Sequence, residues 1–230
     1  MALSSQPQSS EAVEDYAKAI YSLQERLGGP VPTKALAERV GVTPGSASAM
    51  VKRLATQGLV EHVPYHGVAL TASGERLALE VIRHHRLLEL FLAHELGVPW
   101  DRVHVEAEVL EHVLSEELEE RMAAKLGHPT HDPHGDPIPS AELSVEEVET
   151  VSLSSLPPGA AGTFARMSDS DAEMLRYLGD RGISIGDRVE VVERAPFDGP
   201  VVLRVGPAEH TLGGRLADAI RIEVDGPATA

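Results

Sequence analysis

Residues 33–60, TKALAERVGVTPGSASAMVKRLATQGLV, contain two short helical patterns on either side of the tripeptide GVT. Thr33 can cap the first helix, and Thr43 can cap the second, with Pro44 at the first helical position that proline favours. The runs LVEHV and VALT follow and indicate two strands joined by the turn PYHG. Helix, tight turn, helix and hairpin together predict a winged helix-turn-helix.

In this motif the second helix enters the DNA major groove, and its first residues meet the edges of the bases. Hydroxyl groups at a helix N-terminus also suit phosphate contacts. Because hydroxyl groups give little base specificity per contact, DNA shape can supply part of the selectivity. A winged helix that makes only protein contacts is the alternative. The candidate DNA-binding residues are Thr43, Ser46, Ser48, Lys52 and Arg53.

The charge distribution agrees with DNA binding by the N-terminal part of the chain, although the formal net charge of the whole chain is −16. Residues 33–76 contain 3 acidic and 5 basic side chains, whereas residues 81–230 contain 28 acidic and 13 basic ones. The acidic segment 81–230 repels nucleic acid, so we expect any DNA contact in the N-terminal part of the chain. Residues 11–27 precede it and have the apolar periodicity of a helix, with Ser9 or Ser10 available as N-cap.

Composition limits the other possibilities. At 230 residues the chain is longer than a typical single domain, so two or three domains are expected. It has no cysteine, which excludes disulfides and thiolate metal sites and favours a reducing cytosol. No apolar run approaches the roughly 20 residues of a membrane span, and residues 1–10 look like a disordered lead-in without a signal peptide. We therefore expect a cytoplasmic protein with no membrane partner.

The stretch VHVEAEVLEHVL, residues 103–114, lies in a helix predicted from about Arg102 to Leu126. Its two histidines and two of its glutamates are spaced i, i+4, i+7 and i+8, which places them on one helical face roughly 100° wide. A solvated charged face would more usually include lysine or arginine. These four residues are His104, Glu108, Glu111 and His112.

The preceding helix, expected from about Ala72 to His94, contains RHHRLLE, in which His85 and Glu89 form another i, i+4 pair. Ions such as Mn²⁺, Fe²⁺, Co²⁺ and Zn²⁺ accept imidazole nitrogen and carboxylate oxygen. Two neighbouring helices with such pairs predict a site for one ion or two. His84 and His94 lie off this face, and we expect them at the surface.

Residues 127–140, GHPTHDPHGDPIPS, are rich in proline, glycine and histidine and predict a linker or an irregular crossing. Its three histidines, His128, His131 and His134, could bind metal weakly, but we favour the interpretation that they belong to a polar linker. Beyond it, the short runs VETVSLSSL, GTFARMS, DRVEVVE, PVVLRVG and AIRIEV alternate with turns, and one short helix is expected near 171–179. This pattern predicts a small β-barrel.

The order of winged helix, HHRLLE, VHVEAEVLEHVLSEELEERM, PHGDPIP and terminal barrel resembles the diphtheria-toxin-repressor family, its manganese-sensing branch in particular. The resemblance extends from about Val13 to Val224. It implies an α+β, mainly α, fold: a winged helix-turn-helix at 11–76, a helical dimerisation and metal-binding domain at 77–140, and an SH3-like barrel at 141–230. It also implies a homodimeric transcriptional regulator of metal-ion homeostasis, a repressor that binds double-stranded operator DNA.

The resemblance also implies the metal ligands. The family's activating site falls on Asp15, Glu108, Glu111 and His112. Its ancillary site falls on His85, Glu89 and His104, completed by an oxygen ligand from the barrel. For that ligand SDSDAE offers Asp169, Asp171 and Glu173, of which we select Asp171.

The ligand types indicate the metal. Asp15 stands where iron-type members of the family have methionine, and Glu108 stands where they have cysteine. Hard oxygen in place of soft sulfur favours Mn²⁺, with Fe²⁺ as the second choice, while Zn²⁺, Co²⁺ or Cd²⁺ can substitute in vitro. Lys18 departs from the small manganese-type members, which have a glutamate there, and this puts a shared metal pair in doubt.

Two other functions remain as alternatives. A metallohydrolase is disfavoured, because the chain has no HExxH motif and no evident nucleophile, and we therefore predict that the protein is not an enzyme. A winged-helix regulator that responds to a small organic ligand would have metal-independent DNA binding. Metal dependence of DNA binding separates it from a metal sensor.

Overall fold

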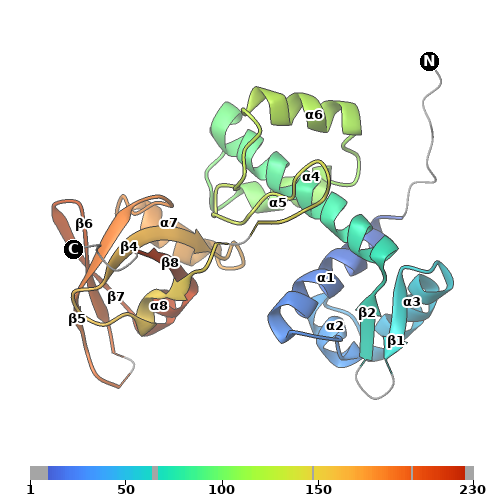
Figure 1. The fold of residues 1–230 in the computed structure, drawn as a ribbon, viewed down its shortest axis with the longest axis horizontal. Helices are drawn as coiled ribbons and strands as arrows, with labels where there is room; N and C mark the ends of the chain where they lie inside the picture. The colour runs from blue at the N-terminus through green and yellow to red at the C-terminus, as the bar shows by residue number, and fades with distance from the viewer. Residues whose placement is uncertain (1–9, 64–66, 147, 198, 226–230) are drawn as a thin grey trace. The chain divides into compact units, whose positions relative to one another are not determined.

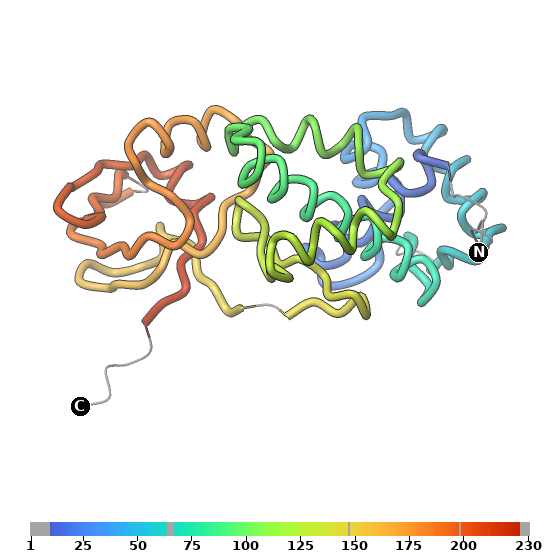
Figure 2. The backbone as a smooth tube through the Cα atoms, turned by 90° about the horizontal axis from the view of Figure 1, so that it is seen from above, coloured from blue at the N-terminus to red at the C-terminus, as the bar shows by residue number. Residues whose placement is uncertain are grey.

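The computed structural model describes residues 10–63, 67–146, 148–197 and 199–225, coloured along the chain in Figure 1 and Figure 2. They form two compact units. The first runs through His84 and includes Glu111–Leu114 and Pro139–Ser144, and the second holds the remainder. These units cut across the expected three domains, so that division stays a prediction. No helix among the described residues is long and apolar enough to cross a membrane.

The first unit contains the predicted winged helix-turn-helix. Thr43 caps the second helix of the motif as expected, since its Oγ1 accepts a hydrogen bond from the Ser46 N–H at 3.2 Å. Thr33 does not cap, because α2 already begins there and Pro32 occupies the N-cap position. The elements are α1 (Glu11–Leu27), α2 (Thr33–Arg39), α3 (Pro44–Thr56), β1 (Val60–Val63) and β2 (Gly67–Leu70).

An apolar core holds these elements together. The buried face of α1 includes Ile20 and Leu23, and it shares one cluster with Leu36 of α2 and Leu54 of α3. Burying such side chains supplies most of the stability of a small helical domain. The wing is an antiparallel hairpin of β1 and β2, and its predicted turn PYHG lies, for residues 64–66, outside the described residues.

The long predicted helix forms α4 (Ala72–Leu96), but the continuous helix expected at 102–126 does not form. The chain makes α5 (Val103–Leu110), leaves the helical path, and starts again at α6 (Glu116–Lys125). Ser115 explains the restart, because its Oγ accepts a hydrogen bond from the Leu118 N–H at 3.3 Å and caps α6. Glu111 and His112 therefore lie in a turn, and the single helical face expected from their spacing was wrong.

The C-terminal part of the second unit is an antiparallel sheet in the order β3-β8-β4-β5-β6-β7. The predicted fold class holds, but the sheet is not closed into a barrel, since among the described strands β3 and β7 remain as edges. Phe164, Leu203 and Ile222 lie in its core. The elements are β3 (Val151–Ser152), η1 (Leu153–Ser155), β4 (Ala161–Met167), α7 (Ala172–Gly179), β5 (Arg188–Arg194), β6 (Val201–Val205), β7 (Ala208–Leu212), α8 (Gly214–Ala219) and β8 (Ile220–Val224).

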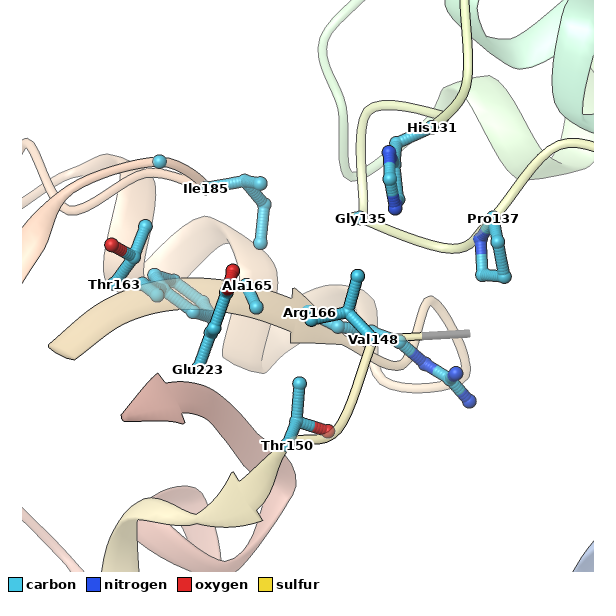
Figure 3. A pocket seen from close by; sticks show the side chains of 12 residues that line it. His131, Gly135, Pro137, Val148, Thr150, Thr163, Ala165, Arg166, Ile185 and Glu223 are labelled. Carbon is cyan, nitrogen blue, oxygen red and sulfur yellow. The ribbon is translucent and has the colours of Figure 1, made fainter. Parts of the chain in front are cut away.

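The proline-rich crossing lies against the sheet. Gly135 has a φ of 81°, and a Cβ built on it would lie 1.9 Å from the carbonyl oxygen of Ala165 in β4. Only glycine permits this approach. A cavity of about 270 Å³ lies at this junction. Figure 3 shows side chains that line it, including His131 and Pro137 of the crossing.

Candidate metal centres and DNA-reading helix

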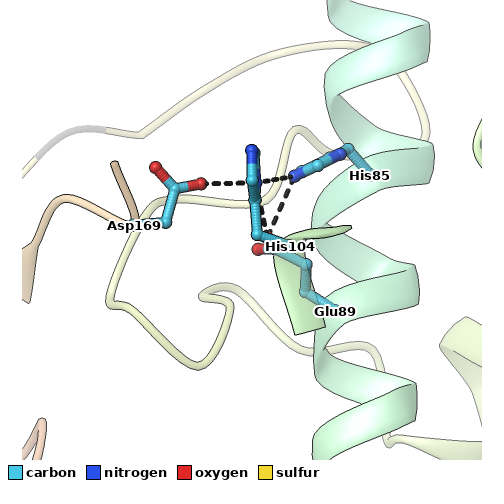
Figure 4. A group of neighbouring side chains, drawn as sticks. All are labelled: His85, Glu89, His104 and Asp169. Carbon is cyan, nitrogen blue, oxygen red and sulfur yellow. Dashed lines mark hydrogen bonds and ion pairs between the residues drawn. The ribbon is translucent and has the colours of Figure 1, made fainter. Parts of the chain in front are cut away.

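One group of potential ligands lies within the second unit, where His85 and Glu89 project from α4 toward His104 of α5 and Asp169 (Figure 4). Glu89 Oε1 lies 2.9 Å from His85 Nε2 and 3.3 Å from His104 Nδ1. The same nitrogen of His104 lies 2.8 Å from Asp169 Oδ2. Two imidazoles and two carboxylates within these distances form a ligand set suited to a first-row divalent ion.

The hydrogen-bonded partners in this group shift the pKa values of its histidine and glutamate in opposite directions. Hydrogen bonds to Asp169 and Glu89 raise the pKa of His104 to about 10, against the opposing effect of burial. Burial alone would raise the pKa of Glu89, but the imidazoles of His104, His134 and His85 hold it well below its usual range. Protons therefore supply the positive charge that a divalent ion would otherwise bring.

The aspartate of the C-terminal sheet domain that faces this group differs from the one selected from the sequence. Asp171 lies at the N-cap of α7, where its carboxylate accepts from the Met174 N–H at 3.3 Å and pairs with Arg215 at 2.9 Å. Asp169, two residues earlier, faces His104 instead. The motif SDSDAE offered both aspartates, and only the local helix start decides which one turns away. We therefore replace Asp171 by Asp169 in this group.

A second set of donors adjoins the first and was missed by the sequence reasoning. Glu89, Asp132 and His134 are all buried, and they bring their donor atoms within 4.8 Å of one another. Glu89 Oε2 lies 3.4 Å from His134 Nδ1, yet within the described part of the chain neither atom has a hydrogen-bond partner. The interpretation of His134 as a polar linker residue was wrong. The available signal was the sequence DPH in the crossing, in which only one residue separates Asp132 from His134.

The other ring nitrogen of His134 is fixed. Nε2 lies 2.7 Å from the carbonyl oxygen of Trp100, which can only accept, so Nε2 donates and Nδ1 faces Glu89. Burial would lower the pKa of His134, but Glu89, Asp132 and the Trp100 carbonyl raise it to about 9. Burial, with the charges of Asp136 and Glu89, raises the pKa of Asp132 to about 8. An imidazole oriented by a backbone carbonyl is a common arrangement around metal ions.

A third group lies in the first unit, where Asp15 of α1 meets the turn that contains Glu111 and His112. His112 Nε2 lies 3.1 Å from Asp15 Oδ1 and 3.6 Å from Glu111 Oε1. Its Nδ1 contacts Glu14 Oε2 at 2.5 Å. Ligands of one ion lie about 3 Å apart, because each bond to the metal is roughly 2.1 Å long, so these donor atoms fit a first-row ion.

Glu108 and His84 border these groups. Glu108 belongs to the second unit, where its Oε1 lies 3.7 Å from His104 Nε2 and 3.9 Å from His85 Nδ1. His84 was expected at the surface, but it is buried, and its Nδ1 lies 3.3 Å from the Glu111 carbonyl oxygen. His94 is exposed, as expected.

The five candidate DNA-binding residues are all exposed at α3 and its cap. Ser48 donates to the Pro44 carbonyl at 2.8 Å, and Arg53 donates to Ser10 Oγ at 3.2 Å. Lys52 is exposed beside them. The helix therefore presents hydroxyl and basic groups on an open surface, which is the chemistry that phosphate and base contacts require.

Comparison with known proteins defines the class as metal-dependent transcriptional repressors. Family models match for the iron-dependent repressor N-terminal DNA-binding domain at residues 8–68 and for its metal-binding and dimerisation domain at 71–140. The FeoA domain matches at 151–224. The iron-dependent repressor IdeR of Mycobacterium bovis is 34% identical over 93% of this chain and 97% of its own. The chain belongs to the diphtheria-toxin-repressor family, as predicted.

Other relatives agree. The diphtheria toxin repressor of Corynebacterium diphtheriae is 32% identical over 93% of this chain and 97% of its own. Among solved structures, a manganese-dependent transcriptional repressor in complex with manganese is 46% identical, with a TM-score of 0.84, over 92% of this chain and 99% of that one. ScaR with bound Cd²⁺ is 31% identical, with a TM-score of 0.76, over 92% and 98% of the two chains.

Proposed function

We propose that this protein is a DNA-binding transcriptional repressor activated by Mn²⁺, with Fe²⁺ as the second candidate. The observation that carries the proposal is the third group, in which Asp15 of α1 meets Glu111 and His112. Helix α1 packs into the core of the winged helix, while the turn directly follows α5. A divalent ion there would tie the DNA-reading unit to the chain segment that leads out of α5.

The ligand chemistry supports manganese. The three groups offer only carboxylate oxygen and imidazole nitrogen, and the chain has no cysteine. Hard oxygen ligands suit Mn²⁺, although Zn²⁺, Co²⁺ and Cd²⁺ bind similar sites in vitro. The family resemblance also implies a ligand role for Glu108, whose carboxylate is a hard oxygen donor as well. The 46% identical relative is a manganese-dependent repressor in complex with manganese, which adds support for the same ion here.

The proposed mechanism is a change in population between two states. When bound, the metal supplies positive charge that offsets the carboxylates of Asp15 and Glu111. Asp15 and His112 then hold α1 and the turn at a fixed separation, and this limits the movement of the recognition helix α3. Such a shift requires tighter metal binding by the DNA-competent state than by the other.

We propose a homodimer as the active form. Val105 and Val109 are one helical turn apart on α5 and are 66% and 70% exposed, which is unusual for two neighbouring valines. A two-fold partner would cover them and would set two recognition helices about 34 Å apart, the spacing of half-sites one DNA turn apart. We propose the cytoplasm as the location of this regulator, and we propose no catalytic role.

The test is a DNA-binding assay on the upstream region of the protein's own gene, titrated with each divalent ion in turn. We expect Mn²⁺ to increase DNA affinity at micromolar concentration. Asp15→Asn should weaken this response, while the exposed matched control Asp180→Asn should keep it, because only Asp15 belongs to the third group. DNA binding that is equally tight without metal would instead support a regulator of the organic-ligand class.

A further inference from the structure

Lys18 is placed where a metal ion would compete with it. Its Nζ donates to Glu111 Oε1 at 2.6 Å, and the Glu111 side chain is completely buried while that of Lys18 is 17% exposed. Lys18 lies one turn after Asp15 on α1, so both side chains reach toward the same turn. A buried carboxylate needs a cation or strong donors nearby, and the ammonium group is one such cation.

The contact involves the oxygen that belongs to the third group. Glu111 Oε1 is the atom that lies 3.6 Å from His112 Nε2, and it is also the atom that accepts from Lys18. A divalent ion bound by Asp15 and His112 would therefore compete with the Lys18 ammonium for Glu111 Oε1. If the ammonium stays, it repels the ion, and if it leaves, its charge must be resolvated.

We propose that Lys18 is a built-in cationic competitor for Glu111, which keeps the metal-free turn folded and raises the metal concentration at which the protein responds. This inference rests on the proposed function of the third group as the activating site. It makes Lys18 a residue that sets sensitivity rather than a ligand. Stability without metal and affinity for metal should consequently change in opposite directions when its charge is removed.

The experiment compares Lys18→Met, Lys18→Gln and Lys18→Arg with wild type. Mn²⁺ affinity is measured by calorimetry without DNA, and melting temperatures are measured with and without Mn²⁺. Lys18→Met should bind Mn²⁺ about tenfold more tightly or better, because a repelling charge near the ion is lost. It should melt at a lower temperature without metal and gain more from Mn²⁺ than wild type does.

The other variants control for shape and charge. Lys18→Gln keeps a hydrogen-bond donor for Glu111 and decides the question if Lys18→Met does not fold. Lys18→Arg keeps the charge and should bind Mn²⁺ like wild type. The exposed Lys34→Met makes the same change in net charge on α2 and should alter neither quantity.

Unchanged or weaker Mn²⁺ binding in the neutral Lys18 variants would overturn the inference, and so would tight binding by Lys18→Arg. Failure of the proposed function has a different signature. In that case wild type binds Mn²⁺ without any change in DNA affinity, and the Lys18 comparison still decides the competition. If wild type binds no Mn²⁺ at all, both ideas fail.

Discussion

Glu89 Oε2 lies 3.4 Å from His134 Nδ1, and both side chains are buried. The other carboxylate oxygen of Glu89, Oε1, faces His85 and His104. One carboxylate therefore borders two groups of donors, one between α4 and α5 and the other at the crossing. A change at this residue acts on both groups at once.

Glu89→Gln should lower the metal content of the protein, because the amide keeps the volume but loses the charge that both groups share. We expect at least about tenfold weaker binding there, with the Asp15 group still able to bind. Equilibrium dialysis against Mn²⁺ measures the bound equivalents. Glu106→Gln, an exposed change on α5, serves as control. Equal metal content in both variants would exclude a ligand role for Glu89.

Metal uptake should release protons, because an imidazole must be deprotonated to bind a metal. The folded pKa of His104 is raised from 6.5 to about 10, so its ion pair with Asp169 stabilises the metal-free chain fully below pH 6.5. That contribution is lost as pH rises through about 10. Metal affinity should therefore increase with pH across this window.

Calorimetry in two buffers of different ionisation enthalpy measures the proton release directly. At pH 8, wild type should release more protons than Asp169→Asn, since the pKa of His104 falls when its main partner loses charge. Identical heats in both buffers for wild type would show that no proton leaves and would contradict the prediction.

Lys52→Ala should weaken DNA binding similarly for all sequences and reduce the slope of log K against log salt by about one, if the side chain contacts a phosphate. Mn²⁺ affinity without DNA should not change. Lys125→Ala removes the same charge from α6, where Lys125 pairs with Glu95 at 3.1 Å, and should leave the slope as it is. An unchanged slope in Lys52→Ala would remove this residue from the phosphate contacts.

Glu108→Cys should shift the preference of the sensor toward softer ions, because a thiolate then offers sulfur in place of oxygen. Glu108→Ala should weaken metal activation without unfolding the helices, since the Glu108 side chain is 41% exposed. Operator binding against free metal concentration compares the two variants with wild type. If Mn²⁺ leaves wild-type DNA affinity unchanged even at millimolar concentration, the manganese assignment is wrong.

Val109→Glu should convert the protein to a monomer, because a two-fold interface places like charges on both partners. Sedimentation at micromolar concentration with Mn²⁺ present measures the change against wild type. The exposed Val42→Glu introduces the same charge between α2 and α3 of the first unit instead of on α5, and this variant should remain a dimer. A wild-type protein that is already monomeric under these conditions would defeat the dimer proposal.

Local signals in the sequence predicted the N-terminal winged helix-turn-helix well. Thr43 as N-cap and Pro44 as first helical residue define the start of α3 through residues adjacent in the sequence. The structure confirms this predicted helix start. The break after α5 was harder, because apolar and acidic periodicity continues through 111–115 and only the Ser115 cap interrupts it. Strand β7 was missed because AEHTL lacks the apolar alternation of a half-buried strand.

The candidate site shows a similar limit. Spacing i, i+4 identified His85 with Glu89, because a helix brings these positions together without help from the rest of the fold. Asp169 and His134 reach Glu89 and its neighbours only through tertiary structure, so no periodicity could point to them. The choice of Asp169 over Asp171 depends on which residue caps α7.

Gly135 lets the sheet determine the position of His134, a candidate ligand that is not part of the sheet. Its missing side chain lets the crossing rest on the Ala165 carbonyl, and His134 is its immediate neighbour. Any larger residue must push the loop off β4 and carry His134 away from Glu89. A Gly135→Ala mutation, although it alters no ligand, polar group or charge, should therefore weaken metal binding by the group of Glu89, Asp132 and His134.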